Sequence, residues 1–234
     1  MSQIQNEVKT INSIQEYKFQ NLSSLTKALL VLLYIAIVFS VLSILDSIMS
    51  YNLYASAQYV DISEEEILNN DMRTGVIAII GMLFYIATIV IFLIWVNKAN
   101  KNSRALGAKN MRFTPGWCVG WWFIPIALWW KPYQAVREIW KTSQDAGNWE
   151  SQENSIVSLW WTLWIISAIV NQIIQRWSMS LYSNYNSTLL DYQNVELTWI
   201  FAGIFDIVLS LVFIKMIREI CNKQLTQFQN QSQN

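Results

Sequence analysis

The sequence predicts an all-α integral membrane protein with four transmembrane helices and one Trp-rich element that re-enters the membrane or lies at its interface. Hydrophobic residues make up 53% of the chain and charged residues only 14%, against about 25% charged residues in soluble domains. The charges fall in blocks and leave five nearly uncharged runs, at 28–45, 74–97, 113–130, 154–175 and 197–214. Each run is close to the roughly 20 residues that a spanning helix needs.

The distribution of Lys and Arg decides how many of these runs cross. If 113–130 does not cross and the other four runs do, starting from a cytoplasmic N-terminus, only Arg73 and Arg176 of the 16 Lys and Arg residues lie outside the cytoplasm. If 113–130 also crosses, the division becomes nearly even. Because short cytoplasmic loops carry an excess of Lys and Arg, the sequence favours four crossings, and five spans are the alternative.

Residues 1–27 predict a cytoplasmic N-terminal amphipathic segment. Apolar residues recur there at roughly helical spacing: Ile4, Val8, Ile11, Ile14 and Tyr17. The first apolar run begins after Lys27 without a small-residue cleavage site, so we interpret it as a retained membrane helix rather than a signal peptide. The membrane domain is expected to cover 28–221.

The run at 113–130 predicts two short helical pieces around a bend. Pro115 and Pro125 lack an N–H group and disfavour helix immediately before themselves, while Gly116 and Gly120 leave room for close backbone approach. Backbone groups freed by such breaks must find partners in protein or water. The run is therefore expected to dip into the membrane or lie at its interface.

The tryptophans of this run predict contact with the lipid headgroups. Trp117 and Trp121 lie one helical turn apart, and indole rings favour the level of the headgroups. We interpret them as an aromatic belt. An aromatic pocket for a lipid or another amphiphile is the alternative.

A helical pattern at 131–144 predicts an amphipathic helix along the inner membrane surface. Pro132 suits the first helical turn. The apolar stripe consists of Tyr133, Val136, Ile139 and Trp140. The polar side consists of Lys131, Gln134, Arg137, Glu138, Lys141 and Gln144. Glu138 is expected to be solvated rather than catalytic.

Asp206 is the only ionisable residue within the four predicted spans. A charged aspartate at mid-membrane costs about 2.5 to 3.5 kcal/mol on insertion scales, so its side chain should face the helix bundle or a wet cavity. One interpretation is a hydrogen bond to another helix, and the other is an ion or proton pathway. The partners considered at comparable depth are Ser40, Tyr85, Thr88 and Ser167.

Enzyme signatures are mostly absent, and the chain contains no His, which is the commonest general base and zinc ligand. We therefore expect no cofactor, metal site or catalytic residue, although membrane enzymes can use Asp, Ser or Lys instead. Cys118 and Cys221 lie on the predicted cytoplasmic side, which disfavours a structural disulfide. The Gln- and Asn-rich residues 222–234 predict a flexible polar tail.

Three stretches between Trp95 and Trp140 carry a resemblance: WVNKANKNSRALG, FTPGWCVGWWFIPIA and WKPYQAVREIW. They are similar to bacterial multi-pass membrane proteins filed as domain of unknown function 4328. Leu128 departs from the pattern, since that family has Asn there. The matching positions are Pro115, Gly116, Trp117, Gly120, Pro125, Pro132, Tyr133, Gln134 and Glu138. The resemblance implies a bacterial multi-helix membrane protein and carries over no activity.

These observations predict a membrane scaffold or sensor that binds a lipid or a protein partner through residues 113–144 and the basic loop 98–112. A small transporter or channel that uses Asp206 is the alternative, and a membrane enzyme is the weakest candidate. The expected partners are the bilayer and either an anionic lipid or a membrane protein, with no nucleic acid, and a homo-oligomer is left open. The expected location is the bacterial inner membrane, with both termini cytoplasmic. The candidate positions are Pro115, Gly116, Trp117, Gly120, Trp121, Pro125, Lys131, Pro132, Tyr133, Gln134, Glu138 and Asp206.

Overall fold

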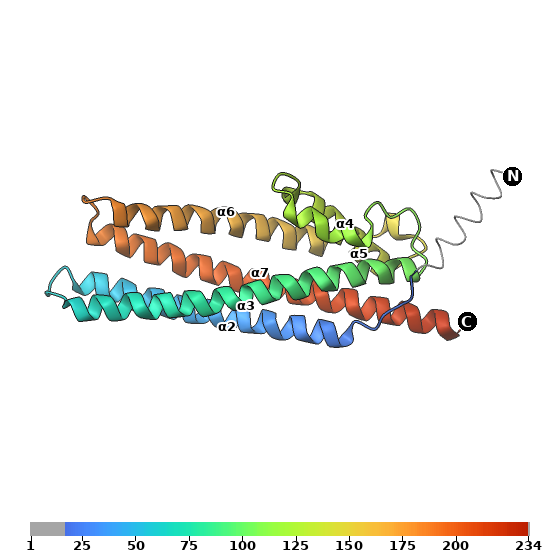
Figure 1. The fold of residues 1–234 in the computed structure, drawn as a ribbon, viewed down its shortest axis with the longest axis horizontal. Helices are drawn as coiled ribbons and strands as arrows, with labels where there is room; N and C mark the ends of the chain where they lie inside the picture. Colours follow the sequence, from blue (N-terminus) through green and yellow to red (C-terminus); the bar gives the residue numbers. More distant parts are fainter. Residues whose placement is uncertain (1–16, 234) are drawn as a thin grey trace. The chain divides into compact units, whose positions relative to one another are not determined.

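The computed structural model describes residues 17–233, apart from the side chain of Tyr182, and this part of the chain is helical without strands. Four long helices dominate it: α2 (Ser23–Ser56), α3 (Glu64–Ala105), α6 (Ser155–Ser183) and α7 (Leu189–Gln233) (Figure 1). Within the described residues these are the four helices long and apolar enough to cross a membrane. The prediction of an all-α chain with four such helices is confirmed.

The helices extend well beyond the predicted spans. They contain 34, 42, 29 and 45 residues, and at about 1.5 Å per residue even α6 is about 44 Å long, against about 30 Å of bilayer hydrocarbon. The uncharged runs are therefore only the centres of longer helices. Ionisable residues just outside a run continue the same helix, as Asp46 does in α2.

Apolar side chains lie exposed on all four helices. The exposed fractions of Val38, Ile79, Ile173 and Phe201, one from each helix, are 56%, 60%, 60% and 70%. Exposed apolar surface of this extent on a protein indicates a membrane or a partner that covers it. Lipid is the simplest cover for helices of this length and composition.

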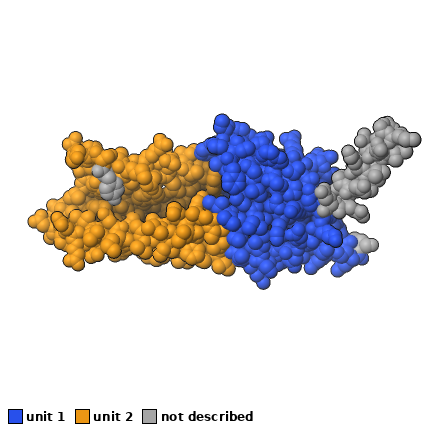
Figure 2. Space-filling view, viewed as in Figure 1, with its two compact units in different colours: residues 1–30, 89–161, 213–234 blue, residues 31–88, 162–212 orange. Residues whose placement is uncertain are grey.

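The chain divides into two compact units (Figure 2). Unit 1 comprises Met1–Leu30, Ile89–Trp161 and Phe213–Asn234, and unit 2 comprises Val31–Thr88 and Thr162–Val212. Each long helix contributes residues to both units. Unit 1 holds the whole Trp-rich element, and unit 2 consists of stretches of the four long helices and the connections at their ends.

In unit 1, residues 113–130 form short helical pieces as predicted: α4 (Pro115–Gly120), η1 (Trp121–Phe123) and η2 (Ala127–Trp129). Thr114 is extended and its hydroxyl caps α4 by accepting from the Trp117 N–H. Ile124, which precedes Pro125, is also extended, because a following proline disfavours helix. Then come α5 (Lys131–Gln144) and η3 (Trp149–Ser151).

The prediction of a flexible tail from residue 222 is wrong for the described residues, because α7 continues to Gln233. Glutamines of this stretch bond to other parts of unit 1. The side-chain amide of Gln224 donates to the Ala99 carbonyl at 3.0 Å, and that of Gln231 donates to the Leu106 carbonyl at 3.0 Å. The amphipathic segment predicted at 1–27 lies outside the described residues up to residue 16, and α2 begins at Ser23.

Candidate functional site

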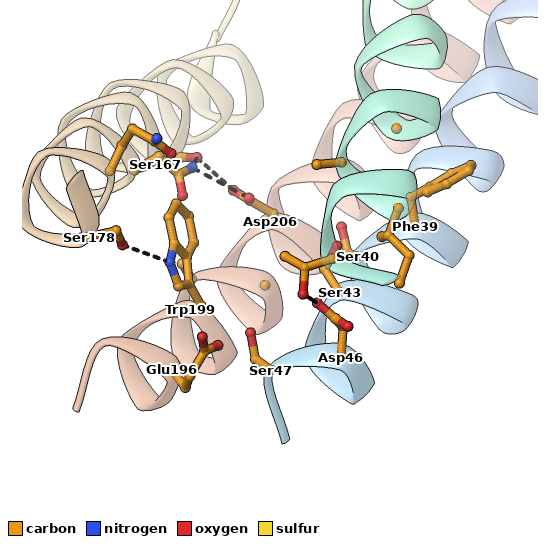
Figure 3. Close-up of a pocket in the computed structure, with 18 of the residues that line it drawn as sticks. Phe39, Ser40, Ser43, Asp46, Ser47, Ser167, Ser178, Glu196, Trp199 and Asp206 are labelled. Carbon is orange, nitrogen blue, oxygen red and sulfur yellow. Dashed lines mark hydrogen bonds between the residues drawn. The ribbon is translucent and has the colours of Figure 1, made fainter. Parts of the chain in front are cut away.

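Unit 2 contains a cavity of about 780 Å³ lined by all four long helices. In the space-filling view the face of unit 2 is hollowed between its helices (Figure 2). Carboxylates, hydroxyls and aromatic rings share the lining with aliphatic side chains. Figure 3 shows Asp206 of α7 turned toward Ser167 of α6, with Ser40, Ser43 and Asp46 on the side of α2.

Small side chains at helical spacing leave this space open. Four of them line the cavity from α2: Ala36, Ser40, Ser43 and Ser47. They recur every three or four residues, so they share one face of the helix. Gly203 on α7 allows close packing against α2 at the same level, because a Cβ built there would lie 2.7 Å from Cγ1 of Ile44. The cavity thus lies beside a tight helix crossing.

Asp206 bonds to neutral partners on α6. The Ser167 hydroxyl donates to its carboxylate at 2.6 Å, and the Asn171 amide donates to the other carboxylate oxygen at 3.4 Å. Asn171 also donates to the Ser167 hydroxyl at 3.0 Å. Ser167 is one of the four partners that the sequence suggested. In the described part of the chain, Asp206 forms no ion pair.

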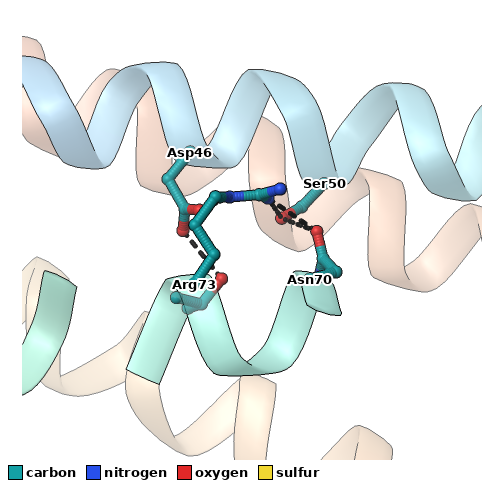
Figure 4. Close-up of polar contacts among 5 residues, drawn as sticks. Asp46, Ser50, Asn70 and Arg73 are labelled. Atoms are coloured by element: carbon teal, nitrogen blue, oxygen red, sulfur yellow. Dashed lines mark hydrogen bonds and ion pairs between the residues drawn. The ribbon is translucent and has the colours of Figure 1, made fainter. Parts of the chain in front are cut away.

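Asp46, by contrast, is neutralised by Arg73. The Arg73 Nε donates to the buried Asp46 carboxylate, and the Thr74 hydroxyl donates to the same group at 2.8 Å. The guanidinium also donates to the Asn70 amide oxygen at 2.7 Å and to the Ser50 hydroxyl at 3.3 Å (Figure 4). This network joins α2 to α3. The pair is half-buried, with 31% of the Arg73 side chain and 7% of the Asp46 side chain exposed, and the added hydrogen bonds help to offset the cost of removing these charges from water.

Glu196 is the third carboxylate of the cavity. It is half-buried on α7, interacts with the Ser47 hydroxyl and lies in the fields of Asp46 and Arg73. Glu196 and Asp206 are ten positions apart on α7, which corresponds to about 15 Å along a helix axis. The cavity therefore has acidic groups at two levels.

Aromatic side chains form part of the cavity walls. The Trp199 indole N–H donates to the Ser178 hydroxyl at 3.2 Å, which fixes the ring between α7 and α6. The ring centroids of Tyr54 and Tyr192 are 5.3 Å apart, and Trp199 and Tyr192 both pack on a buried apolar cluster. These rings are therefore held by their neighbours rather than free to rotate.

Of the twelve candidate positions, only Asp206 lies at this cavity, and the other eleven lie in unit 1. Pro115 and Pro132 are buried at the starts of α4 and α5. The rings of Trp117 and Trp121 lie 4.8 Å apart, and the Lys131 ammonium lies 5.5 Å from the Trp121 ring centroid. The remaining positions are Gly116, Gly120, Pro125, Tyr133, Gln134 and Glu138.

The close backbone approach expected at the glycines is not observed. A Cβ at Gly116 would meet nothing within 4 Å, and one at Gly120 would lie 3.1 Å from the Trp117 side chain, which is exposed. Tyr133 has a polar role instead: its hydroxyl lies 3.0 Å from that of Ser158 on α6 and accepts from the Asn154 amide. Gln134 is part of α5 and is half-buried.

Glu138 is buried, so the expectation of a solvated carboxylate is wrong. Its oxygens accept from the backbone N–H groups of Arg112 and Phe113 at 3.2 and 3.3 Å. Burial raises the pKa of Glu138, and these two hydrogen bonds and the nearby arginines oppose that rise. Burial, aided by the Glu138 charge, raises the pKa of Cys118 to about 12. Cys118 is therefore a poor nucleophile.

The segment 98–112 is not one basic loop, because α3 continues to Ala105. Polar side chains of α3 hold the following chain instead. The side-chain amide of Asn97 donates to the Pro115 carbonyl at 2.7 Å. The Asn100 amide and the Arg104 guanidinium both donate to the Phe113 carbonyl, at 3.1 and 2.9 Å. Arg104 is thus engaged within unit 1 rather than free to meet lipid headgroups.

Comparison with known families decides the relationship. A family model described as "Domain of unknown function (DUF4328)" matches residues 59–222, well over half of the chain. This protein belongs to the DUF4328 family. A search of curated proteins found no match, and a search of solved structures found none.

The DUF4328 match covers most of the cavity. Arg73, Glu196 and Asp206 lie inside it, whereas Asp46 and the small-residue face of α2 lie before it. The stretches from Trp95 to Trp140 that carry the resemblance also fall inside it. Their polar contacts hold the 106–115 segment and α5 in place, so they support the fold of unit 1. The DUF4328 description assigns no activity.

Sequence reasoning missed Asp46, Arg73 and Glu196. Each lies one residue outside a predicted span, because a span defined by absence of charge ends at the first charge. The recurrence of Ser and Ala at three- and four-residue spacing on α2 is the sequence signal that could have identified the cavity. Among the described residues, no group of three or more His, Cys, Asp or Glu side chains is placed to hold a metal ion.

Proposed function

We propose that this protein binds a small amphiphilic molecule in the cavity of unit 2 and acts as a membrane sensor or scaffold. The observation that carries the proposal is the cavity itself. Its volume of about 780 Å³ lies within the roughly 300 to 1,000 Å³ of small-molecule sites, and its mainly apolar walls with a few placed polar groups are typical of such sites. Membrane-soluble molecules would reach it from the lipid.

The membrane is proposed to be the bacterial inner membrane, with four crossings and both termini cytoplasmic. The location of all Lys and Arg residues except Arg73 and Arg176 supports this orientation. Cys221 is buried, so an exposed neighbour is the better reporter. Asn222→Cys should react with an impermeant maleimide only after the membrane is opened, and labelling in intact cells would refute the orientation.

The Trp-rich element is proposed to lie at the cytoplasmic membrane interface or to dip into it. Its bend exposes apolar side chains: Phe123 and Ile126 are 71% and 74% exposed, and Trp129 and Trp130 are 45% and 44% exposed. Such a cluster next to Lys131 suits the boundary between headgroups and hydrocarbon. The cations Lys98, Lys101, Lys109 and Arg112 would add attraction to anionic lipids, at about 1 kcal/mol for each residue near the surface.

Cavity filling tests the proposed binding function. Ala168 lines the cavity on α6, whereas its neighbour Ile169 is an exposed side chain outside the lining. We expect small molecules that copurify with the wild-type protein in mild detergent, identified by native mass spectrometry, to be lost from Ala168→Trp and retained by Ile169→Trp. Equal retention by the two folded variants would contradict the proposal.

A small transporter or channel is the second candidate, and Asp206 is the observation that favours it. A carboxylate without an ion pair among its described neighbours, inside an apolar helix, is typical of ion and proton pathways. Asp206→Asn keeps an oxygen for the Ser167 hydroxyl but cannot titrate. If an ion or proton passes through Asp206, the folded Asp206→Asn variant should lose the ion or proton flux that the wild type shows in proteoliposomes. Unchanged flux would exclude a pathway through Asp206.

A further inference from the structure

We infer that the cavity ligand carries a positive charge and is an organic cation with an apolar body. The inference rests on the proposed binding function and names the class of molecule bound. Three features of the cavity carry it: the balance of charge in the lining, the aromatic walls, and the separation of the acidic groups.

The side chains of the lining that can carry a full charge near neutral pH are all acidic. Asp46, Glu196 and Asp206 are the carboxylates among the described lining residues, and no Lys or Arg is among them. Arg73, which is not among the lining residues, pairs with Asp46 and neutralises it. Among the described residues, the side-chain partners of Asp206 are a hydroxyl and an amide, both uncharged. Glu196 and Asp206 are half-buried, and a half-buried carboxylate gains more from a cation than a fully exposed one does, so a cationic ligand is favoured over a neutral or anionic one.

The aromatic walls suit a cation with little hydration. Trp199 lines the cavity between the levels of Glu196 and Asp206 and is fixed by its bond to Ser178 (Figure 3). Tyr54 and Tyr192 lie at the Glu196 end. Ring faces attract ammonium and related cations, most strongly when the cation is desolvated, and aromatic sites recognise quaternary ammonium groups in this way.

The acidic groups of the cavity are too far apart for a single metal ion to contact both Glu196 and Asp206. Glu196 and Asp206 are about 15 Å apart along α7, and a single metal ion contacts ligands only at about 2 to 2.6 Å. An organic cation can place its charged group near one carboxylate and its apolar body against the rings and aliphatic side chains. The cavity of about 780 Å³ has room for such a molecule.

Two probes of matched shape and opposite charge test the inference on the full chain in neutral detergent. Equilibrium dialysis would compare tetraphenylphosphonium with tetraphenylborate. We expect the phosphonium to bind and the borate to bind at least about tenfold more weakly. The double variant Asp206→Asn, Glu196→Gln removes the carboxylate at both levels of the cavity and should weaken phosphonium binding by about tenfold. Glu65→Gln, an exposed carboxylate on the first turn of α3, should leave it unchanged.

The outcomes separate this inference from the proposed function. Equal binding of both probes, abolished by Ala168→Trp, would overturn the cation preference and leave the cavity as a binding site. If the phosphonium does not bind, the cation inference is overturned. It is also overturned if the phosphonium binds equally to the wild type and to Ala168→Trp, because binding then lies outside the cavity. Displacement of the phosphonium by lysophosphatidylethanolamine would identify a lipid headgroup as the source of the cation, and displacement only by dodecyltrimethylammonium would identify a free amphiphilic amine.

Discussion

At the scale of single residues, the environment of a carboxylate determines its role more than its position in the sequence does. Glu138 looked solvated because it follows the polar side of a helical pattern. It is buried instead, and the backbone N–H groups of Arg112 and Phe113 donate hydrogen bonds to its carboxylate. Asp206 was expected to face the bundle, and its bond to Ser167 places it there. The environment of Asp206 could be predicted from the apolar sequence around it. The environment of Glu138 could not, because it depends on the backbone of residues 112 and 113, which are distant in sequence.

Glu138 gives a pH-dependent stability that the Gln variant lacks. Burial raises its pKa in the folded state above the usual value of 4.5, so the folded protein holds this proton more tightly than the unfolded chain. The contribution is present below the unfolded pKa and is lost as pH rises through the folded pKa.

We therefore expect the melting temperature of the wild type, relative to Glu138→Gln, to fall as pH rises from about 4.5 toward neutrality. The measurement is thermal unfolding of both proteins in the same detergent between pH 4 and 8. A difference that is constant with pH, or that grows in favour of the wild type, would contradict the assigned environment.

At the scale of elements, the sequence predicts the existence of helices better than their ends. The apolar centres of α2, α3, α6 and α7 follow from composition, because about 20 uncharged residues have few other solutions. The ends of these helices do not follow from composition, because a helix continues into a charged or amide-rich stretch when groups elsewhere in the fold bond to that stretch. Residues 222–233 illustrate this: the stretch looked unable to fold alone, and Gln224 and Gln231 gain partners only within unit 1.

The crossing of α2 and α7 depends on Gly203. A Cβ at this position would lie 2.7 Å from Ile44 Cγ1, whereas a Cβ at Gly75 on α3 would meet nothing within 4 Å. We expect Gly203→Ala to destabilise unit 2 by about 1 to 3 kcal/mol through overpacking. Gly75→Ala should be neutral or stabilising, since alanine favours helix by about 1 kcal/mol over glycine. Reversible unfolding in mixed micelles would compare the two, and equal stabilities would argue against close packing at Gly203.

At the scale of the whole molecule, the Trp-rich element and the candidate binding cavity belong to different units. Unit 1 contains the Trp-rich element and the polar contacts of the stretches that resemble DUF4328, and unit 2 contains the cavity. The most distinctive sequence therefore marks a structural element, while the candidate site is built from common residues such as Ser and Ala. Sequence reasoning favoured the distinctive segment because a cavity arises only when faces of four helices meet.

The proposed function requires that polar residues of unit 2 line a cavity that solvent or a ligand can reach between the four long helices. Substituted cysteines in membranes test it directly, in a background in which Cys118 and Cys221 are alanine. Ser43→Cys and Ala168→Cys line the cavity, and their neighbours Leu42→Cys and Ile169→Cys are exposed outside it.

The measured quantity is the rate of reaction with the water-soluble reagent methanethiosulfonate ethylammonium, which attacks the thiolate and so requires a hydrated site. We expect each cavity position to react at least about tenfold faster than its neighbour, because lipid-facing thiols stay protonated. Equal rates within both pairs would contradict the cavity and with it the proposed function.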